Sequence, residues 1–445
     1  MNKNVAIAAK NKQYTLTTWK AQKSWQPMTM TRSKGVYFWD ADDKKYMDWS
    51  SQLVNVNVGH SHPRVVKAIQ DQASKLCFAM PSLASEPRGQ LGEALSKVTP
   101  KGHTKTFFTL GGADSNENAM KMARMYTGRQ KVIGRYRAYH GSTFGAMSAS
   151  GDPRKGPSDP GVPWTVHVHD PDTYRSPLYQ GRSQEEGDAL LIAQIAQTIE
   201  FEGPETIAAI ILEGYSGTSG ILQGGEVFWR GIQNLCDKHG IMLIIDEVMS
   251  GFGRTGRWFG VDHYPYVKPD FLVMAKGLTS GYIPMGGISV SDRVAEYFEE
   301  NTLHAGLTYS AHTLACAAAI ATLEVYHEEN LIEHANEMGK VLRAGLLDLA
   351  EGHRCVGDVR GTGLLQVLDL VKSRETREPM SGFNQPQTEP MLKMMALCRE
   401  KGLSAFSRWN WLFSAPPLVA TEEQIQWALE ILDEALNIAD EYVTD

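Results

Sequence analysis

Helical patterns and short apolar runs alternate along the middle of the chain. Helices are expected over residues 63–76, 88–98, 116–127 and 228–239, and strands over 104–109, 131–135, 207–212, 242–245 and 271–274. Almost continuous apolar strands that are separated by helices are typical of a parallel sheet buried on both faces. The pattern therefore predicts a large α/β domain at residues 61–312, with a mostly parallel central sheet flanked by helices.

The two ends of the chain together predict a second, smaller α+β domain. Near the N-terminus, the strand-like runs 35–39 and 45–49 flank an acidic turn. The C-terminal part follows a long helical pattern at 314–328 and combines helices with short strands, at 333–350, 387–401 and 421–442 and at 363–368 and 412–414. Residues 373–387 predict a surface loop. We assign residues 1–60 to an N-terminal arm and small-domain segment, and 313–445 to a linking helix and the C-terminal small domain.

Composition and charge narrow the range of partners. The chain has 445 residues, of which 42% are hydrophobic and 21% charged, as is ordinary for a globular protein with a sizeable core. A formal net charge of −7 leaves no basic excess for a phosphate backbone, so nucleic acid is not expected as a partner. The apolar runs are far shorter than the ~20 residues of a membrane span. Five scattered cysteines without a C-x-x-C pair, and a polar N-terminal stretch, favour a cytoplasmic enzyme.

Two of the predicted strands end in side chains of opposite charge. Asp246 follows the run 242–245, and Lys276 follows 271–274. In open α/β sheets ligands bind beyond the carboxyl ends of the strands, so both side chains are expected at one edge. A desolvated lysine is a neutral nucleophile that can form a Schiff base with a carbonyl. Pyridoxal phosphate (PLP) enzymes need such a lysine, and an acid that keeps the pyridine nitrogen protonated. Taken singly, an acidic helix cap and a surface lysine are the simpler interpretations.

A phosphate-binding turn and an aromatic residue accompany this pair. Residues 109–116 combine a strand end, the pair Gly111 and Gly112, and a helix start. Backbone N–H groups at a helix N-terminus bind phosphate, and glycine allows close approach. Tyr139, which precedes His140 after another predicted strand, is suited to stacking on a planar ring. Each signal is weak alone, because many strand–helix turns contain glycine and core packing is the simpler interpretation of Tyr139.

Two other kinds of site are less well supported. Residues 251–256 match G-x-G-x-x-G, but five residues separate them from the preceding strand and no helix-forming run follows, which argues against a dinucleotide site. The histidine pairs at 60/62 and 167/169 lack a third ligand at a recognisable spacing, so no metal is expected.

Together, these segments resemble the class III (ω-amino acid:pyruvate type) aminotransferases of PLP fold type I over nearly the whole chain. The most specific block is IIDEVMSGFGRTG at 244–256, followed by KPDFLVMAKG at 268–277. Supporting matches lie at 57–63, 111–117, 139–143 and 306–312. The resemblance implies a large PLP-binding domain, a smaller α+β domain and amino transfer.

The resemblance also implies roles around the cofactor ring. Lys276 would form the Schiff base and carry the transferred proton, while Asp246 would pair with the pyridinium nitrogen. Tyr139 would stack on one face of the ring, and Val248 would pack on the other.

Further positions that match the family would surround the ring and the phosphate. His140 and Glu213 would lie near the cofactor. The phosphate would be held by Gly111, Gly112 and Ala113, joined by Thr308 of a second subunit. A site completed in this way makes a homodimer the smallest active unit, and a tetramer is compatible with it.

Several positions depart from the common pattern of the family where substrate would bind. Val54 replaces a tryptophan of many amine-accepting members, and Glu213 is followed by glycine instead of proline. Phe406 stands at the position of the mobile carboxylate-binding arginine, and Arg408 is close enough in sequence to take that role. A guanidinium suits a carboxylate and a sulfonate equally well in charge.

We therefore expect ping-pong transfer from an amino donor to a 2-oxo acid. The donor would be an ω-amino acid or amine such as taurine or β-alanine, and the acceptor pyruvate or 2-oxoglutarate. Two alternatives stay open at this point. Another PLP reaction on the same fold, by an aminomutase, racemase or decarboxylase, keeps Lys276 but needs no second acceptor. A non-catalytic binding protein would leave Asp246 and Lys276 as surface charges.

Overall fold

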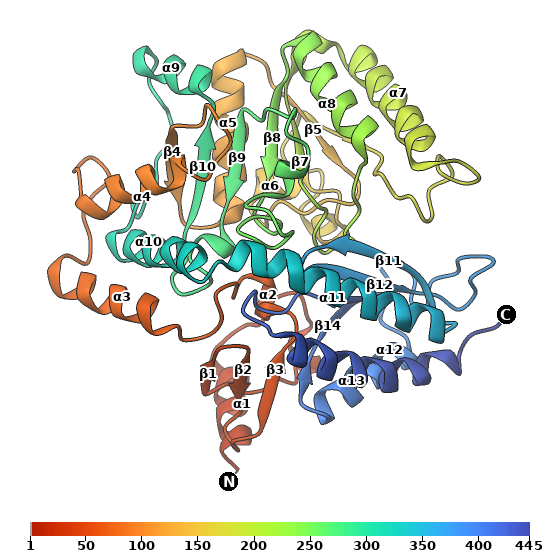
Figure 1. Cartoon of the computed structure of the whole chain (residues 1–445). Coiled ribbons are helices and arrows are strands. Elements are labelled where there is room, and N and C mark those ends of the chain that lie inside the picture. The colour runs from red at the N-terminus through yellow and green to blue at the C-terminus, as the bar shows by residue number, and fades with distance from the viewer. Residues whose placement is uncertain (1) are drawn as a thin grey trace.

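A seven-stranded sheet forms the centre of the computed structural model, which describes residues 2–445 (Figure 1). The strands lie in the order β4 (Lys105–Thr109), β10 (Gly286–Val290), β9 (Phe271–Met274), β8 (Met242–Asp246), β7 (Ile207–Glu213), β5 (Lys131–Arg135) and β6 (Thr165–Val168). Neighbours from β9 to β6 are parallel, whereas β10 is antiparallel to both β9 and β4. The predicted mostly parallel sheet is confirmed.

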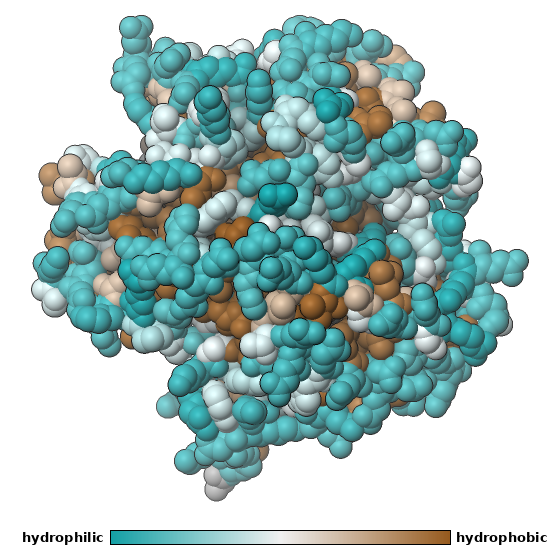
Figure 2. All heavy atoms as spheres, in the orientation of Figure 1, coloured by the Kyte–Doolittle hydropathy of each residue, from teal (hydrophilic) through white to brown (hydrophobic). Residues whose placement is uncertain are grey.

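Both faces of this sheet are covered, as the apolar runs predict. Every residue of β7, β8 and β9 is buried. Alternate residues of β7 enter two separate cores, with Ile210 and Leu212 in one and Ala209 and Ile211 in the other, because successive side chains of a strand point to opposite faces. The covering helices include α5 (Gly112–Thr127), α7 (Gln184–Glu202), α8 (Glu226–His239) and α9 (Asp292–Glu300). Figure 2 shows mainly hydrophilic atoms on the outside, with hydrophobic atoms in the seams between elements.

The N- and C-terminal parts of the chain meet in two smaller sheets. In one, β1 (Arg32–Lys34), β2 (Tyr37–Trp39) and β3 (Lys45–Asp48) are joined by β13 (Leu403–Ser404), which pairs in parallel with β3. The other has the order β11 (Val356–Thr362), β12 (Leu365–Leu370), β15 (Trp411–Ser414), β14 (Phe406–Arg408). The helices beside them are α10 (Thr313–Glu328), α11 (Leu331–Gly352), α12 (Glu389–Glu400) and α13 (Glu422–Asp440) (Figure 1).

Four further α-helices lie along the chain. They are α2 (Ser51–Val54), α3 (Pro63–Lys75), α4 (Glu86–Ser96) and α6 (Phe144–Ala149). Within residues 2–445, no helix combines the length and the apolar character that crossing a membrane requires.

Some elements were not expected from the sequence. The N-terminal arm contains α1 (Lys3–Tyr14), a helix without a single buried residue and so without an apolar stripe to reveal it. Helix α7 was also missed, although Ser183 and Glu186 form a capping box at its start. The predicted helix at 116–127 begins four residues earlier, at Gly112, so the glycine pair lies directly at its N-terminus.

A fully buried arginine ties the two ends of the chain to the loop after β8. Arg254 donates to the carbonyl oxygens of Leu364 and Pro416, at 3.0 and 2.5 Å, and to Ser51 Oγ and Asn57 Oδ1, at 3.2 and 2.8 Å. None of these four partners is a carboxylate. Burial lowers the pKa of Arg254 to about 10, so the guanidinium stays charged at neutral pH.

We predict that Arg254→Met lowers the free energy of unfolding by roughly 2–4 kcal/mol, because buried acceptors on three separate segments lose their donor. Urea unfolding at a fixed protein concentration measures this change. Exposed Arg257, in the same loop, provides the matched control, and Arg257→Met is expected to change stability by less than about 0.5 kcal/mol. Equal effects of the two substitutions would contradict the role of Arg254.

Candidate active site

Three neighbouring parallel strands deliver charged side chains to one edge of the central sheet. In register, Glu213 at the end of β7 lies opposite Asp246 at the end of β8, and Asp246 lies opposite Val273 of β9. Lys276 follows β9 by two residues. The structure thus brings Asp246 and Lys276 to the same carboxyl edge, where α/β sheets bind their ligands.

The carboxylate of Asp246 is buried and held by three donors. Its Oδ2 accepts hydrogen bonds from Asn116 Nδ2 at 2.7 Å and His140 Nδ1 at 2.8 Å. Its Oδ1 accepts from the backbone N–H of Val248 at 3.0 Å. With both oxygens fixed, Asp246 presents a rigid anion to a group that enters the site.

Lys276 combines an unusual backbone with a desolvated amine. Its φ is +39°, in the left-handed region that residues other than glycine seldom occupy and that is frequent at functional sites. Burial lowers the pKa of Lys276, although the charges of Asp246 and Glu213 oppose the shift. Among residues 2–445, its ammonium has no hydrogen-bond partner. A nucleophilic lysine requires a lowered pKa and an amine that is free of hydrogen bonds.

Glu213 positions the aromatic residue of the site. Its Oε1 accepts from the backbone N–H of Tyr139 at 3.0 Å, and its Oε2 from that of Gly217 at 2.6 Å. Burial raises the pKa of Glu213, against the influence of His140. Tyr139 is half-buried, and the guanidinium carbon of Arg154 lies 3.7 Å from its ring centroid. One face of the Tyr139 ring is therefore covered by a cation.

The glycine turn at the start of α5 lies against Val248. A Cβ placed on Gly112 would lie 3.0 Å from both methyl groups of Val248, and one placed on Gly141 would lie 2.4 Å from the Cβ of Ala113. Gly111, Gly112 and Ala113 therefore line a narrow turn whose first helical N–H groups have no partner within α5 itself. Such a turn has the geometry that an anionic group requires.

Two of the predicted substrate residues pack together. Val54 and Phe406 belong to one apolar cluster, together with Tyr215, Trp409 and Trp411. Val54 has a φ of +57°, which is an outlier for a β-branched residue and marks a strained loop at this position.

Two arginines share one carboxylate next to this cluster. Arg408 Nη2 lies 2.8 Å from Asp152 Oδ2, and Arg154 Nε donates to Asp152 Oδ1 at 2.8 Å. Both guanidinium groups also reach Thr218 Oγ1, at 2.9 and 3.3 Å. The side chain of Asp152 is completely buried, and because two guanidinium groups face this one carboxylate, the group carries one positive charge in excess.

Sequence reasoning missed Asn116 as a partner of Asp246 and missed the whole Asp152–Arg154 pair. Trp19 of the N-terminal arm was missed as well, and its ring centroid lies 5.2 Å from the guanidinium carbon of Arg154. The Asp152–Arg154 pair is local, but its contacts with Arg408 and Trp19, like that of Asn116 with Asp246, join segments far apart in sequence, and no local pattern indicates them. Thr308 is exposed on the turn before α10, and among the described residues no hydrogen bond joins it to the site.

Comparison with known proteins agrees with this geometry. The family model for class III aminotransferases matches residues 19–436. The chain belongs to the class III aminotransferases. This aminotransferase is 34% identical to a putrescine–pyruvate aminotransferase of Pseudomonas aeruginosa, over 92% of this chain and 90% of the relative. It is 32% identical to the mitochondrial gamma-aminobutyrate transaminase 1 of Oryza sativa subsp. japonica, over 94% and 83% of the two chains.

A solved structure is similar over almost the full length of the aminotransferase. Taurine:2-oxoglutarate aminotransferase of Bifidobacterium kashiwanohense, in complex with PLP and glutamate, superimposes with a TM-score of 0.95. The two chains are 41% identical, and 99% of each is covered. The predicted fold and the PLP cofactor are thus confirmed.

The residues of the site fit this cofactor. The amine of Lys276 is available for its aldehyde, Asp246 for its pyridine nitrogen, and the N–H groups at the start of α5 for its phosphate. Two buried polar atoms beside Asp246, Asn116 Oδ1 and His140 Nε2, have no hydrogen-bond partner within the described chain. The two unpaired atoms and the free amine can therefore still bond to a group that is bound in the site.

We predict that the apoprotein captures PLP at a rate that rises with pH and levels off below the ordinary lysine pKa of about 10.4, because burial favours the neutral amine of Lys276. To measure this rate at each pH, the Schiff base is trapped with borohydride and the absorbance of the fixed cofactor is read. In Asp246→Asn the inflection moves to still lower pH, because a charge that raises the pKa of Lys276 is removed. Lys276→Ala is the control and should fix no cofactor. An inflection at or above 10.4 would contradict the assignment.

Proposed function

We propose that this aminotransferase moves the amino group of an acid-bearing ω-amine, such as taurine or β-alanine, to 2-oxoglutarate or pyruvate by a ping-pong mechanism. The observation that carries the proposal is the pair Arg154 and Arg408 around Asp152, because their excess positive charge matches one carboxylate or sulfonate. The similarity to a taurine:2-oxoglutarate aminotransferase supports the same substrate class.

Each residue of the cleft has a part in this reaction. When bound, PLP supplies an electron sink for the carbon that bears the transferred amino group. Lys276 Nζ would take the proton from that carbon and return it on the far side of the transferred nitrogen. Asp246 would keep the pyridine nitrogen protonated, with Asn116 and His140 fixing the orientation of its carboxylate. Glu213 keeps Tyr139 in place beside the ring.

Arg154 is the better placed of the two arginines to contact the substrate. It stacks on Tyr139 and faces Trp19, and its Nη1 makes no hydrogen bond within residues 2–445. Arg408 donates through Nη1 and Nη2 to Thr218 and Asp152. We assign the direct contact to Arg154, and to Arg408 the second positive charge of the subsite.

A homodimer is part of the proposal. Apolar side chains near Thr308 are exposed in the single chain, namely Phe78, Met80, Leu83 and Tyr309. A second copy that covers them would bring Thr308 to the phosphate end of its partner's site, as the family resemblance implies. The cytoplasmic location stays a prediction from the sequence.

We predict that Arg154→Leu raises KM for taurine and β-alanine roughly 10- to 100-fold, because a hydrogen bond to a charged group contributes about 1.5–3 kcal/mol. KM for 1-phenylethylamine, which has no acid group, should not change. Steady-state kinetics with each donor and 2-oxoglutarate measures the difference. Arg408→Leu should act in the same direction.

The neighbouring Lys155→Leu provides a control, since it removes a positive charge from the same segment but not from the pair around Asp152. An equal rise in KM for donors with and without an acid group would refute the assignment of Arg154. A wild-type enzyme that accepts no acid-bearing donor would refute the proposed substrate class.

A further inference from the structure

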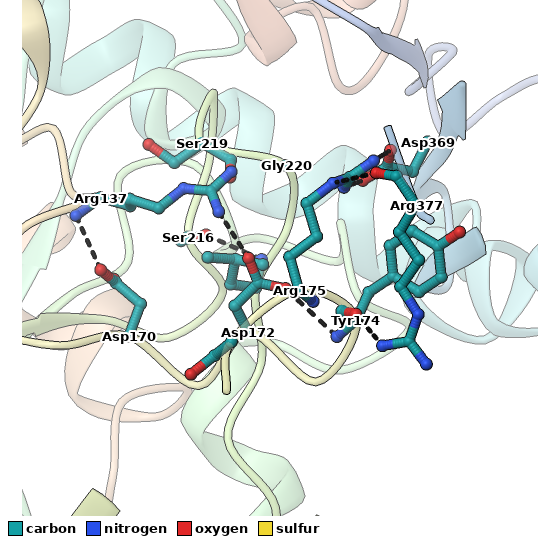
Figure 3. Close-up of polar contacts among 12 residues, drawn as sticks. Arg137, Asp170, Asp172, Tyr174, Arg175, Ser216, Ser219, Gly220, Asp369 and Arg377 are labelled. Atoms are coloured by element: carbon teal, nitrogen blue, oxygen red, sulfur yellow. Dashed lines mark hydrogen bonds and ion pairs between the residues drawn. The ribbon is translucent and has the colours of Figure 1, made fainter. Parts of the chain in front are cut away.

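A buried carboxylate joins the C-terminal sheet to the loops of the central sheet. Asp369 of β12 is fully buried and accepts five hydrogen bonds. Arg175 donates two of them, at 2.5 and 2.7 Å, and Arg360 donates one at 2.9 Å. Asn410 Nδ2 and Trp411 Nε1 complete the set, at 2.6 and 2.9 Å. Figure 3 shows Arg175 reaching from the loop of Asp172 and Tyr174 to Asp369.

The charges around Asp369 keep it ionised. Burial opposes its ionisation, but Arg360 and Arg175 outweigh burial and hold the pKa of Asp369 below its ordinary value. Arg360 also donates to Asp358 at 2.6 Å and to the carbonyl oxygen of Gly220 at 2.9 Å. Charge-assisted, bidentate pairs of this kind are strong and fix geometry.

Asp369 accepts hydrogen bonds from two residues that lie just after Arg408 in the sequence. In the β14–β15 hairpin, Arg408 pairs across with Trp411, so Trp409 and Asn410 form the turn. Asp369 therefore holds one residue of the turn and the first residue of β15. On the opposite strand, Arg408 meets Asp152 and Thr218, which lie on loops of the central sheet.

Arg137 also contacts this hairpin, through the ring of Trp411. The guanidinium carbon of Arg137 lies 4.8 Å from the ring centroid of Trp411. Arg137 donates to Asp172 at 2.6 Å through its side chain and to Asp170 at 2.9 Å through its backbone N–H (Figure 3). Trp411 is thus held by Asp369 at its indole nitrogen and by Arg137 at its ring. Arg137 lies two residues before Tyr139.

We propose that Asp369 is a positioning residue of the acid-binding subsite, because it fixes the hairpin that places Arg408 against Asp152. The proposal rests on the function proposed above, since the ligand of the subsite is the acid group of the substrate. A small displacement of the hairpin would separate Arg408 from Asp152 and Thr218. The contribution of such contacts falls steeply when the interacting groups are displaced from their places.

The test compares three variants of the PLP-loaded enzyme. Asp369→Asn keeps the shape but replaces an acceptor by a donor that faces arginine and tryptophan N–H groups. Trp411→Phe keeps the ring and removes one hydrogen bond to Asp369. Asp188→Asn is the matched control, because Asp188 is an equally buried carboxylate on α7 that accepts from Tyr179 and Gly225 and does not contact the hairpin.

Two readouts separate positioning from stability. The first is KM for taurine compared with KM for 1-phenylethylamine, and the second is the inhibition constant of glutarate, an unreactive dicarboxylate. Asp369→Asn should raise KM for taurine and the glutarate constant about tenfold and leave 1-phenylethylamine unchanged. Trp411→Phe should shift the same two values by less, and Asp188→Asn should shift neither.

Loss of thermal stability without a selective rise in KM for taurine would overturn the proposal. If Asp369→Asn does not fold, unchanged values in Trp411→Phe overturn it, and raised values support it. Failure of the proposed function is recognised separately, since it would appear as a wild-type enzyme without preference for acid-bearing donors. Glutarate binding in the variants then still decides the role of Asp369.

Discussion

The carboxylate of Asp246, fixed opposite the amine of Lys276, is the constraint around which this aminotransferase is built. Parallel pairing of β7, β8 and β9 brings Glu213, Asp246 and Lys276 to one edge of the sheet. Helix α5 contributes at two places, because its first residues line the narrow glycine turn and its Asn116 donates to Asp246. The central sheet thus positions the charged residues of the site, and burial lowers the pKa of the Lys276 amine.

The proposed acid-binding subsite depends on a different set of contacts. The subsite around Asp152 takes Arg154 from the loop after α6, Arg408 from the C-terminal sheet and Trp19 from the N-terminal arm. Because these segments belong to separate parts of the chain, their relative placement sets the geometry of the two guanidinium groups. The buried network at Asp369 joins the C-terminal sheet to the loop after β6, from which Arg175 comes.

The sequence was sufficient for the core of the fold and for the reactive pair. Apolar runs located β5 and β9 with their observed bounds, and the ends of β8 and β9 placed Asp246 and Lys276 correctly. Strand β10 was not predicted, because its glycine-containing run GGISV is not a continuous apolar stretch. Arg154 was not predicted as a site residue for another reason. Its importance arises from a long-range stack on Tyr139 and from an aspartate shared with Arg408, and neither leaves a periodic signal.

We propose that Asp246 speeds the proton transfer at Lys276 by keeping the pyridine nitrogen protonated. Rapid mixing of an amino donor with the PLP-loaded enzyme, in the absence of any oxo acid, follows the first half-reaction by absorbance. The wild-type enzyme should convert to the pyridoxamine form and return on addition of 2-oxoglutarate. Asp246→Asn, with its cofactor still bound, should convert about 100-fold or more slowly. Equal rates in the two proteins would contradict the account.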